Sequence, residues 1–163
     1  MHVSPPGTLV TIEEGRAFLE TNKEAGSFCP CCDRLDKVYK RALNSRMARG
    51  LIWLYFASDK GAHDVALSTA PAWLLQTNEL ATTRYWGFIV QAPKEEGDLS
   101  RRTSGVWNMH QRGILAVERK ITFPRRVHTY RGEVIGWDEH EIYIDTAVGV
   151  RFNYPKLMSA RGQ

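Results

Sequence analysis

Cys29 and Cys32 are the residues whose types and spacing most directly suggest chemistry. The C-x-x-C spacing lets two thiolates reach one tetrahedral zinc ion. A structural zinc needs four protein ligands, and the sequence has no second C-x-x-C pair and no closely spaced pair of histidines. Two alternatives stay open. One is a structural zinc with Cys29 and Cys32 as ligands; the other, which the missing second pair favours, is a tight turn with small buried thiols. A redox pair would need a thioredoxin-like βαβ pattern, which is absent.

A second set of candidate residues lies in the helix expected between Asn78 and Trp86. At 100° per residue, one side of this helix holds Leu80, Thr83, Arg84 and Gly87. Leu80 identifies that side as the core side, with Arg84 at its margin, so Asn78, Thr82 and Tyr85 face outward. Asparagine can bond adenine, threonine can touch a thymine methyl, and Arg84 can extend to a phosphate. The alternative is an ordinary polar helix face, which Glu79 favours because a carboxylate repels phosphate.

Basic residues form three groups along the chain. The first lies between residues 34 and 49 and includes Lys40, Arg41 and Arg46. The second is Arg101 with Arg102, and the third lies between residues 125 and 131. The first two groups suit phosphate contacts, although a charge run such as the first is often only a solvated face. Three acidic residues oppose the second group: Glu95, Glu96 and Asp98.

The elements expected to position these residues run from Ser68 to Glu118. Ser68 caps a short helix with Pro71 in its first turn, and Thr77 or Asn78 caps the next, which Gly87 ends. Residues 88–90 continue as a strand, residues 93–102 read as an exposed turn, and residues 105–109 return as a strand. Residues 110–118 suit a closing helix.

The segments TRYWGFIVQAP and SGVWNMHQRGILAVERK resemble the recognition helix, wing and last helix of winged helix-turn-helix DNA-binding domains. In MHQRG, Met109 and His110 replace the Leu and Thr of the Leu-Thr-x-x-Gly found in many such domains. With CPCC and VYKRALNSRMARGL, nearly the whole chain resembles a group of small bacteriophage proteins. The resemblance implies a winged-helix core that binds duplex DNA.

The flanking segments complete an α+β interpretation in three parts. Residues 1–43 hold a Cys-containing hook and a helix that Thr11 and Glu14 begin with a capping box. Residues 44–120 form the winged-helix domain, whose first helix starts at Asn44 or Ser45. Residues 121–163 form an antiparallel β-meander packed on the core, with strands at 127–130, 134–137 and 142–145.

Bulk composition limits the function classes. The 163 residues carry a net charge of +4 with a pI near 9.1, which permits a polyanionic partner. The longest apolar stretch, residues 51–57, is far shorter than the ~20 residues of a membrane span. The segment MHVSPPGTLV has no basic region followed by an apolar block, so we expect no secretory signal and a cytoplasmic protein of a bacterial host. Catalytic motifs are absent, so we expect no enzyme. The leading hypothesis is a regulatory DNA-binding protein, either a monomer or a homodimer, and the alternative is a module that binds a host protein.

Overall fold

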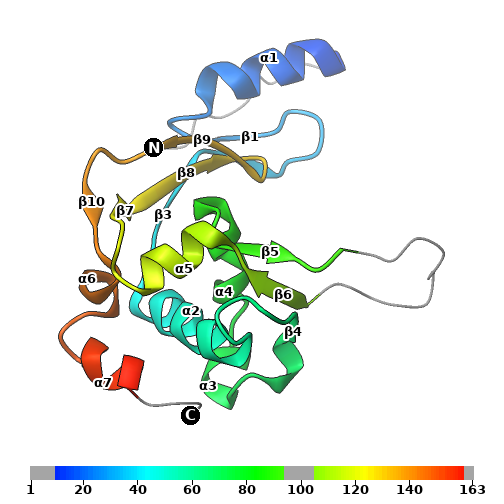
Figure 1. Cartoon of the computed structure of the whole chain (residues 1–163). Helices are drawn as coiled ribbons and strands as arrows, with labels where there is room; N and C mark the ends of the chain where they lie inside the picture. Colours follow the sequence, from blue (N-terminus) through cyan, green and yellow to red (C-terminus); the bar gives the residue numbers. More distant parts are fainter. Residues whose placement is uncertain (1–9, 94–104, 160–163) are drawn as a thin grey trace. The chain divides into compact units, whose positions relative to one another are not determined.

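The computed structural model describes residues 10–93 and 105–159 of the chain (Figure 1). The chain divides into two compact units. Unit 1 comprises residues 1–41 and 126–138, and unit 2 comprises residues 42–125 and 139–163. Both combine helices with short antiparallel strands, which agrees with the predicted α+β class. In the described ranges, every helix is too short or too polar to cross a membrane.

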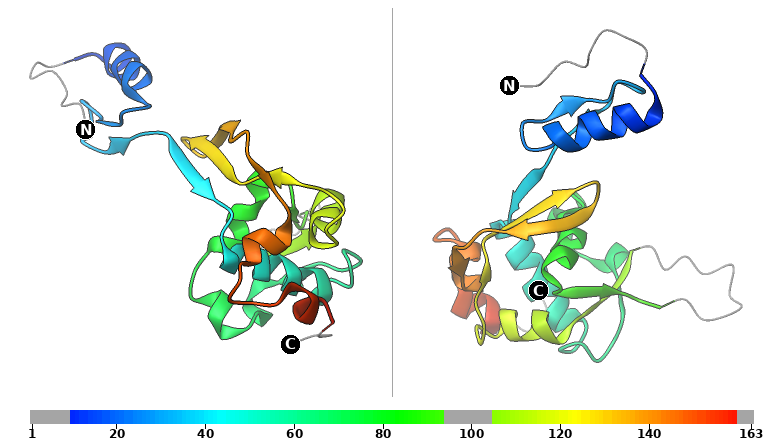
Figure 2. Two further views of the ribbon diagram at one scale, coloured as in Figure 1. Left: turned by 90° about the vertical axis from the view of Figure 1, so that its left-hand side faces the viewer. Right: turned by 90° about the horizontal axis from the view of Figure 1, so that it is seen from above.

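Unit 1 begins with α1 (Ile12–Asn22), whose first turn is held by the predicted capping box. The Thr11 N–H donates to Glu14 Oε2 at 2.8 Å, and the Glu14 N–H donates to Thr11 Oγ1 at 3.2 Å. Two backbone donors that the helix cannot satisfy internally are therefore paired. α1 packs on β1 (Ser27–Phe28), which pairs antiparallel with β2 (Leu35–Asp36) (Figure 2).

The rest of unit 1 is a three-stranded sheet in the order β3–β8–β9. Its strands are β3 (Tyr39–Ala42), β8 (Arg126–Tyr130) and β9 (Glu133–Trp137). Arg131 and Gly132 join β8 to β9 with φ values of 51° and 82°, as a two-residue hairpin turn requires. Asp36 Oδ2 accepts from Tyr130 Oη at 2.8 Å and from Arg131 Nη2 at 2.7 Å. These bonds connect the end of β2 to the β8–β9 hairpin.

Unit 2 is built around α2 (Ser45–Ala57). Asn44 begins the helix, as predicted, because its Oδ1 accepts the Met47 N–H at 2.9 Å. Leu51 and Leu54 are fully buried. Helices packed against α2 include α4 (Glu79–Thr82), α5 (Gln111–Val117) and α6 (Ile144–Val148) (Figure 1). Packing by several partners explains why apolar residues occupy so much of the α2 surface.

Between α2 and α5 the chain passes through two short helices and a three-stranded sheet. The further elements are β4 (Val65–Ala66), η1 (Leu67–Thr69), α3 (Ala72–Leu75), the 3₁₀ helix η2 (Thr83–Trp86), β5 (Ile89–Gln91) and β6 (Val106–Met109). β6 lies between β4 and β5 and is antiparallel to both. Gly87, with φ of 72°, ends η2 as predicted. The first helix of the pair starts later than predicted, because Pro71 rather than Ser68 precedes it.

A close backbone contact holds α5 against Phe88, the residue before β5. A Cβ added to Gly113 would lie 2.1 Å from the Phe88 carbonyl oxygen. The same oxygen accepts the His110 N–H at 2.9 Å. His110 also begins α5, because its Nδ1 accepts the Arg112 N–H at 3.2 Å. Position 113 therefore requires glycine, since any side chain would push the helix off the Phe88 carbonyl.

The predicted β-meander is wrong in its third strand. β8 and β9 form a hairpin, but residues 142–145 do not continue the sheet of unit 1. Instead β10 (Glu141–Ile142) pairs with β7 (Phe123–Pro124) in unit 2, and α6 begins at Ile144. Ile144, Ala147 and Val148 have helical spacing and are buried, so their packing outweighs the strand preference of a short β-branched run. The segment predicted as one domain, residues 121–163, is thus divided between the two units.

Burial in the core of unit 2 follows the predicted faces in part. Ile52 and Leu80 are buried, as predicted, whereas Trp73 and Leu115 are only half-buried. The C-terminal α7 (Tyr154–Ser159) packs on α2. Its Tyr154 Oη donates to the Val117 carbonyl at 2.6 Å, which connects it to the end of α5.

Leu80→Ala is expected to lower the free energy of unfolding by about 2–5 kcal/mol, the range for removing a buried leucine. Leu80 is only 2% exposed. Chemical denaturation with Leu75→Ala as control is the measurement. Leu75 is 52% exposed, so its truncation should change stability by less than ~0.5 kcal/mol. Equal losses in the two variants would contradict the placement of α4.

Gly113→Ala is expected to destabilise unit 2 by about 1–3 kcal/mol or more, as overpacking does. The added methyl group would overlap the Phe88 carbonyl oxygen. Gly136→Ala is the matched control, because a Cβ there meets its nearest atom, His128 Nδ1, at 3.6 Å. Thermal denaturation of both variants measures the difference, and a fully stable Gly113→Ala protein would disprove the contact.

Candidate nucleic-acid interface

The segment from Asn78 to Trp86 is helical, but its second half is tighter than an α-helix. α4 continues directly into η2, and a 3₁₀ helix has 3.0 residues per turn. Leu80, Thr83 and Trp86 therefore share the core side, with exposed fractions of 2%, 0% and 1%. Arg84, predicted at the margin of this side, is exposed. The Thr83 hydroxyl is satisfied by donating to the Leu80 carbonyl at 2.7 Å.

Polar side chains occupy the outer side of α4 and η2. Asn78 and Arg84 are exposed, and Thr82 and Tyr85 are half-buried. Asn78 directly precedes α4, yet its side chain makes no capping hydrogen bond, so the amide remains available to a ligand. The Arg84 guanidinium lies over the Tyr85 ring at 5.1 Å from its centroid. This cation–π contact orients the arginine along the outer side.

The Glu79 carboxylate, which we expected to repel phosphate, forms a hydrogen bond and an ion pair with residues at the start of α2. Its Oε1 accepts from Asn44 Nδ2 at 3.1 Å, and its Oε2 accepts from the Thr77 hydroxyl at 3.4 Å. Arg46 Nε lies 3.7 Å from the same Oε2. Both charged side chains of this ion pair are about one-third exposed, so the pair is weak in energy. It nevertheless offsets the negative charge beside Asn78.

The remaining predicted DNA-binding residues are distributed over the chain. Arg46 lies beside Thr77, with Nη1 3.5 Å from the threonine hydroxyl, so it borders the start of α4. Lys40 and Arg41 are exposed on β3 and belong to unit 1. Arg101 and Arg102 lie outside the described residues, as do Glu95, Glu96 and Asp98.

Hydrogen bonds from α5 and β7 fix the end of η2. Arg112 Nε donates to the Trp86 carbonyl at 3.0 Å, which satisfies an acceptor at the end of the helix. The Trp86 indole Nε1 donates to the Pro124 carbonyl at 2.7 Å. Trp86 is buried, and hydrogen bonds engage both its carbonyl and its indole. These bonds hold the end of η2, and with it the outer side of the helical segment, in place.

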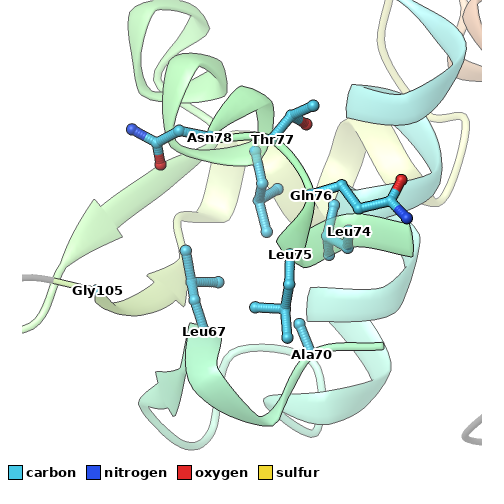
Figure 3. Close-up of a pocket in the computed structure, with 9 residues that line it drawn as sticks. Leu67, Ala70, Leu74, Leu75, Gln76, Thr77, Asn78 and Gly105 are labelled. Atoms are coloured by element: carbon cyan, nitrogen blue, oxygen red, sulfur yellow. The ribbon is translucent and has the colours of Figure 1, made fainter. Parts of the chain in front are cut away.

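An apolar pocket that the sequence did not predict lies beside the turn between α3 and α4 (Figure 3). Its volume is about 360 Å³. Leu67, Leu74 and Leu75 supply much of the lining, and Thr77 and Asn78 add polar atoms. The pocket therefore adjoins the start of the polar outer side and suits an apolar side chain or ring.

An arginine that sequence reasoning left out of the site lies on α2. The Arg49 guanidinium is placed between the Trp73 ring and the Phe152 ring, at 4.1 Å and 3.8 Å from their centroids. The only sequence signal was the position of Arg49 at the end of the first basic group, three residues after Arg46.

The Cys29–Cys32 turn joins β1 to β2. The Cys29 N–H donates to the Arg34 carbonyl and the Asp33 N–H donates to the Cys29 carbonyl, both at 2.8 Å. Asp33 has φ of 57°, which closes a tight turn. Hydrogen bonds from the backbone N–H groups of Cys31 and then Cys32 lower the pKa of the Cys29 thiol, while burial opposes them. N–H groups directed at sulfur favour a thiolate.

The three cysteines are free thiols; Cys29 is half-buried and Cys31 and Cys32 are exposed, so the tight turn is present but the prediction of buried thiols is wrong. Cys31 Sγ lies against α1, 2.9 Å from where a Cβ on Gly15 would stand, and burial raises the pKa of the Cys31 thiol. Cys29 and Cys32 remain as a two-thiol half-site. Within the described ranges, no group of three His, Cys, Asp or Glu residues is arranged to hold a metal ion.

No protein-family model matches the sequence, and neither the curated proteins nor the solved structures include a significantly similar chain.

Metal analysis of protein purified without chelator tests the zinc alternative. We expect far less than one zinc per chain, because the half-site offers two thiolates where a structural zinc needs four ligands. One zinc per chain, with chelation lowering the melting temperature and Cys29→Ser removing the metal, would overturn that expectation. Half a zinc per chain in a dimer would indicate one ion shared by two copies. Arg34→Ser, in the same turn, is the control variant.

Proposed function

We propose that the chain is a winged-helix protein that binds duplex DNA in a regulatory role. The order of elements in unit 2 is the main support. α2 is followed by β4, the helix pair α3 and α4, and the hairpin of β5 and β6, with β6 between β4 and β5. This order and pairing correspond to the expected winged helix-turn-helix. In helix-turn-helix proteins the second helix of the pair enters the major groove.

In this proposal the outer side of α4 and η2 reads bases. The major groove is wide enough to admit a helix, and an asparagine amide can bond adenine N6 and N7 together. The uncapped amide of Asn78 would make that contact, with Thr82 and Tyr85 beside it. Arg84 would bind a phosphate, since its guanidinium is exposed and oriented by the Tyr85 ring. Phosphate contacts position the protein and base contacts specify the site.

The hairpin of β5 and β6 would follow the DNA backbone. Arg101 and Arg102 lie in the sequence that connects these strands, together with Glu95, Glu96 and Asp98. Phosphate attraction and repulsion therefore compete within this connection. Closer to the helix, the contacts that Glu79 makes with Asn44 and Arg46 reduce the corresponding repulsion.

Salt titrations of DNA binding test the proposal. Affinity should fall with a log–log slope of about −0.9 for each phosphate neutralised. Replacing Arg101 and Arg102 together by Ala should weaken binding to every duplex and make the slope shallower. Asn78→Ala should instead cost about 1–3 kcal/mol on a site selected from random duplexes, and little on other sequences.

Arg16→Ala is the control for charge loss, because Arg16 is exposed on α1 of unit 1. It should leave both affinity and slope unchanged. Correctly folded protein that binds no duplex at low salt would exclude DNA as the partner.

The apolar pocket favours a second candidate function, binding of a host protein. A partner could insert an apolar side chain between Leu67 and Leu75, beside the same helix pair. Pull-down from bacterial lysate with and without nuclease separates the two functions. Capture that survives nuclease and is lost in Leu75→Glu, with duplex binding absent, would support the protein partner instead of DNA.

A further inference from the structure

Three arginines of unit 2 gather where α2, α3 and the segment before α7 meet. Arg46 and Arg49 lie on α2, and Arg151 lies between α6 and α7. Trp73 on α3 and Phe152 cover the Arg49 guanidinium at 4.1 Å and 3.8 Å. Both distances are those of close cation–π contacts, and a guanidinium with a ring on either side still carries five N–H donors in its own plane.

Positive charge in this arginine cluster is poorly compensated. Burial, followed by the charges of Arg46 and Arg151, lowers the pKa of Arg49. With other described residues, neither Arg49 nor Arg151 forms an ion pair, and Arg46 pairs only with Glu79, at 3.7 Å. Three cations thus face one carboxylate, and that carboxylate also accepts bonds from Asn44 and Thr77. An anion bound here would reduce the repulsion among the three guanidinium groups, which remains in the folded protein.

A buried donor in the cluster also lacks a partner. Arg49 Nε is inaccessible to solvent and makes no hydrogen bond among the described residues. Buried polar groups in proteins are nearly always bonded, and an exception calls for an explanation such as an absent ion. The described residues therefore supply no acceptor to this N–H, so the charge of the Arg49 guanidinium is unpaired within the described part of the chain.

We propose that Arg49, with Arg46 and Arg151, binds a phosphate group. A phosphate offers several acceptor oxygens to more than one guanidinium and carries the charge that this cluster lacks. Its source is either a backbone phosphate of duplex DNA or free phosphate. With DNA as the source the inference rests on the proposed function, and it adds a contact beside α3, separate from the base-reading side of α4. Arg46, bonded to Thr77 at the start of α4, connects the two regions.

The first experiment measures duplex affinity at several salt concentrations for Arg49→Gln and Arg151→Gln. Each should weaken binding to all sequences alike and make the log–log slope shallower by about 0.9 for one lost phosphate contact. Arg49→Lys should bind with intermediate affinity, because an ammonium keeps the charge but not the stacked planar fork. Arg16→Gln, the matched control in α1, should match the wild type.

The second experiment uses inorganic phosphate as the probe and the melting temperature as the readout, at constant ionic strength with chloride in the reference buffer. Phosphate should raise the melting temperature of the wild type, because a ligand of the folded state stabilises it. Arg49→Gln and Arg151→Gln should lose this rise. If Arg49→Gln fails to fold, Arg151→Gln decides, since Arg151 is exposed.

The outcomes separate this inference from the proposed function. Duplex binding by the wild type that both glutamine variants retain in full, with no phosphate-dependent rise in melting temperature, would overturn the phosphate site and leave the DNA proposal standing. A protein that binds no duplex but shows a rise abolished by Arg49→Gln would remove the DNA proposal. It would support the site with free phosphate as its ligand.

Discussion

The contact between Gly113 and the Phe88 carbonyl is the constraint on which the geometry of unit 2 depends. Phe88 is fully buried, with its ring edge-on to Phe123 at 5.0 Å between centroids, so its carbonyl cannot move without unpacking the core. α5 is held at that carbonyl, and Arg112 reaches from α5 to the last carbonyl of η2. A helix as short as α4 is marginal by itself. Its orientation, and with it the proposed reading surface, therefore depends on contacts with other parts of unit 2.

Local signals in the sequence were sufficient where capping decides the structure. Thr11 and Asn44 identify the starts of α1 and α2 because each caps a backbone group three residues away. The same signals failed where distant packing decides. Residues 142–145 resemble one strand, but the strand β10 ends at Ile142 and the helix α6, which packs on α2, begins at Ile144. η2 is tightened into a 3₁₀ helix, with Trp86 buried and bonded to the Pro124 carbonyl, and nothing within the segment itself indicates that partner.

In the candidate site, too, the sequence predicted the features that depend on neighbouring residues and missed those that depend on distant ones. Helical periodicity identified Asn78, Thr82 and Tyr85, because these residues lie within about two turns of one helical segment. Periodicity did not predict the hydrogen bond that the Asn44 side chain, at the start of α2, donates to the Glu79 carboxylate. The Arg49 stack was beyond sequence reasoning altogether, since Trp73 and Phe152 come from separate parts of the chain. The C-x-x-C spacing predicted that Cys29 and Cys32 lie close together. It did not predict the backbone N–H groups directed at the Cys29 sulfur, which belong to a turn that Asp33 closes in the left-handed conformation.

Unit 1 is made of two stretches of chain separated by most of unit 2, and this interruption has a consequence during synthesis on the ribosome. α1 and the β1–β2 hairpin emerge before unit 2, but β3 lacks its neighbour β8 until residues 126–130 have been made. Domains fold as units when their chain is complete. Residues 42–125, which contain α2, the sheet around β6 and α5, are available before that point. The amino-terminal segment must therefore wait, with one strand edge unpaired, while much of the other unit is translated.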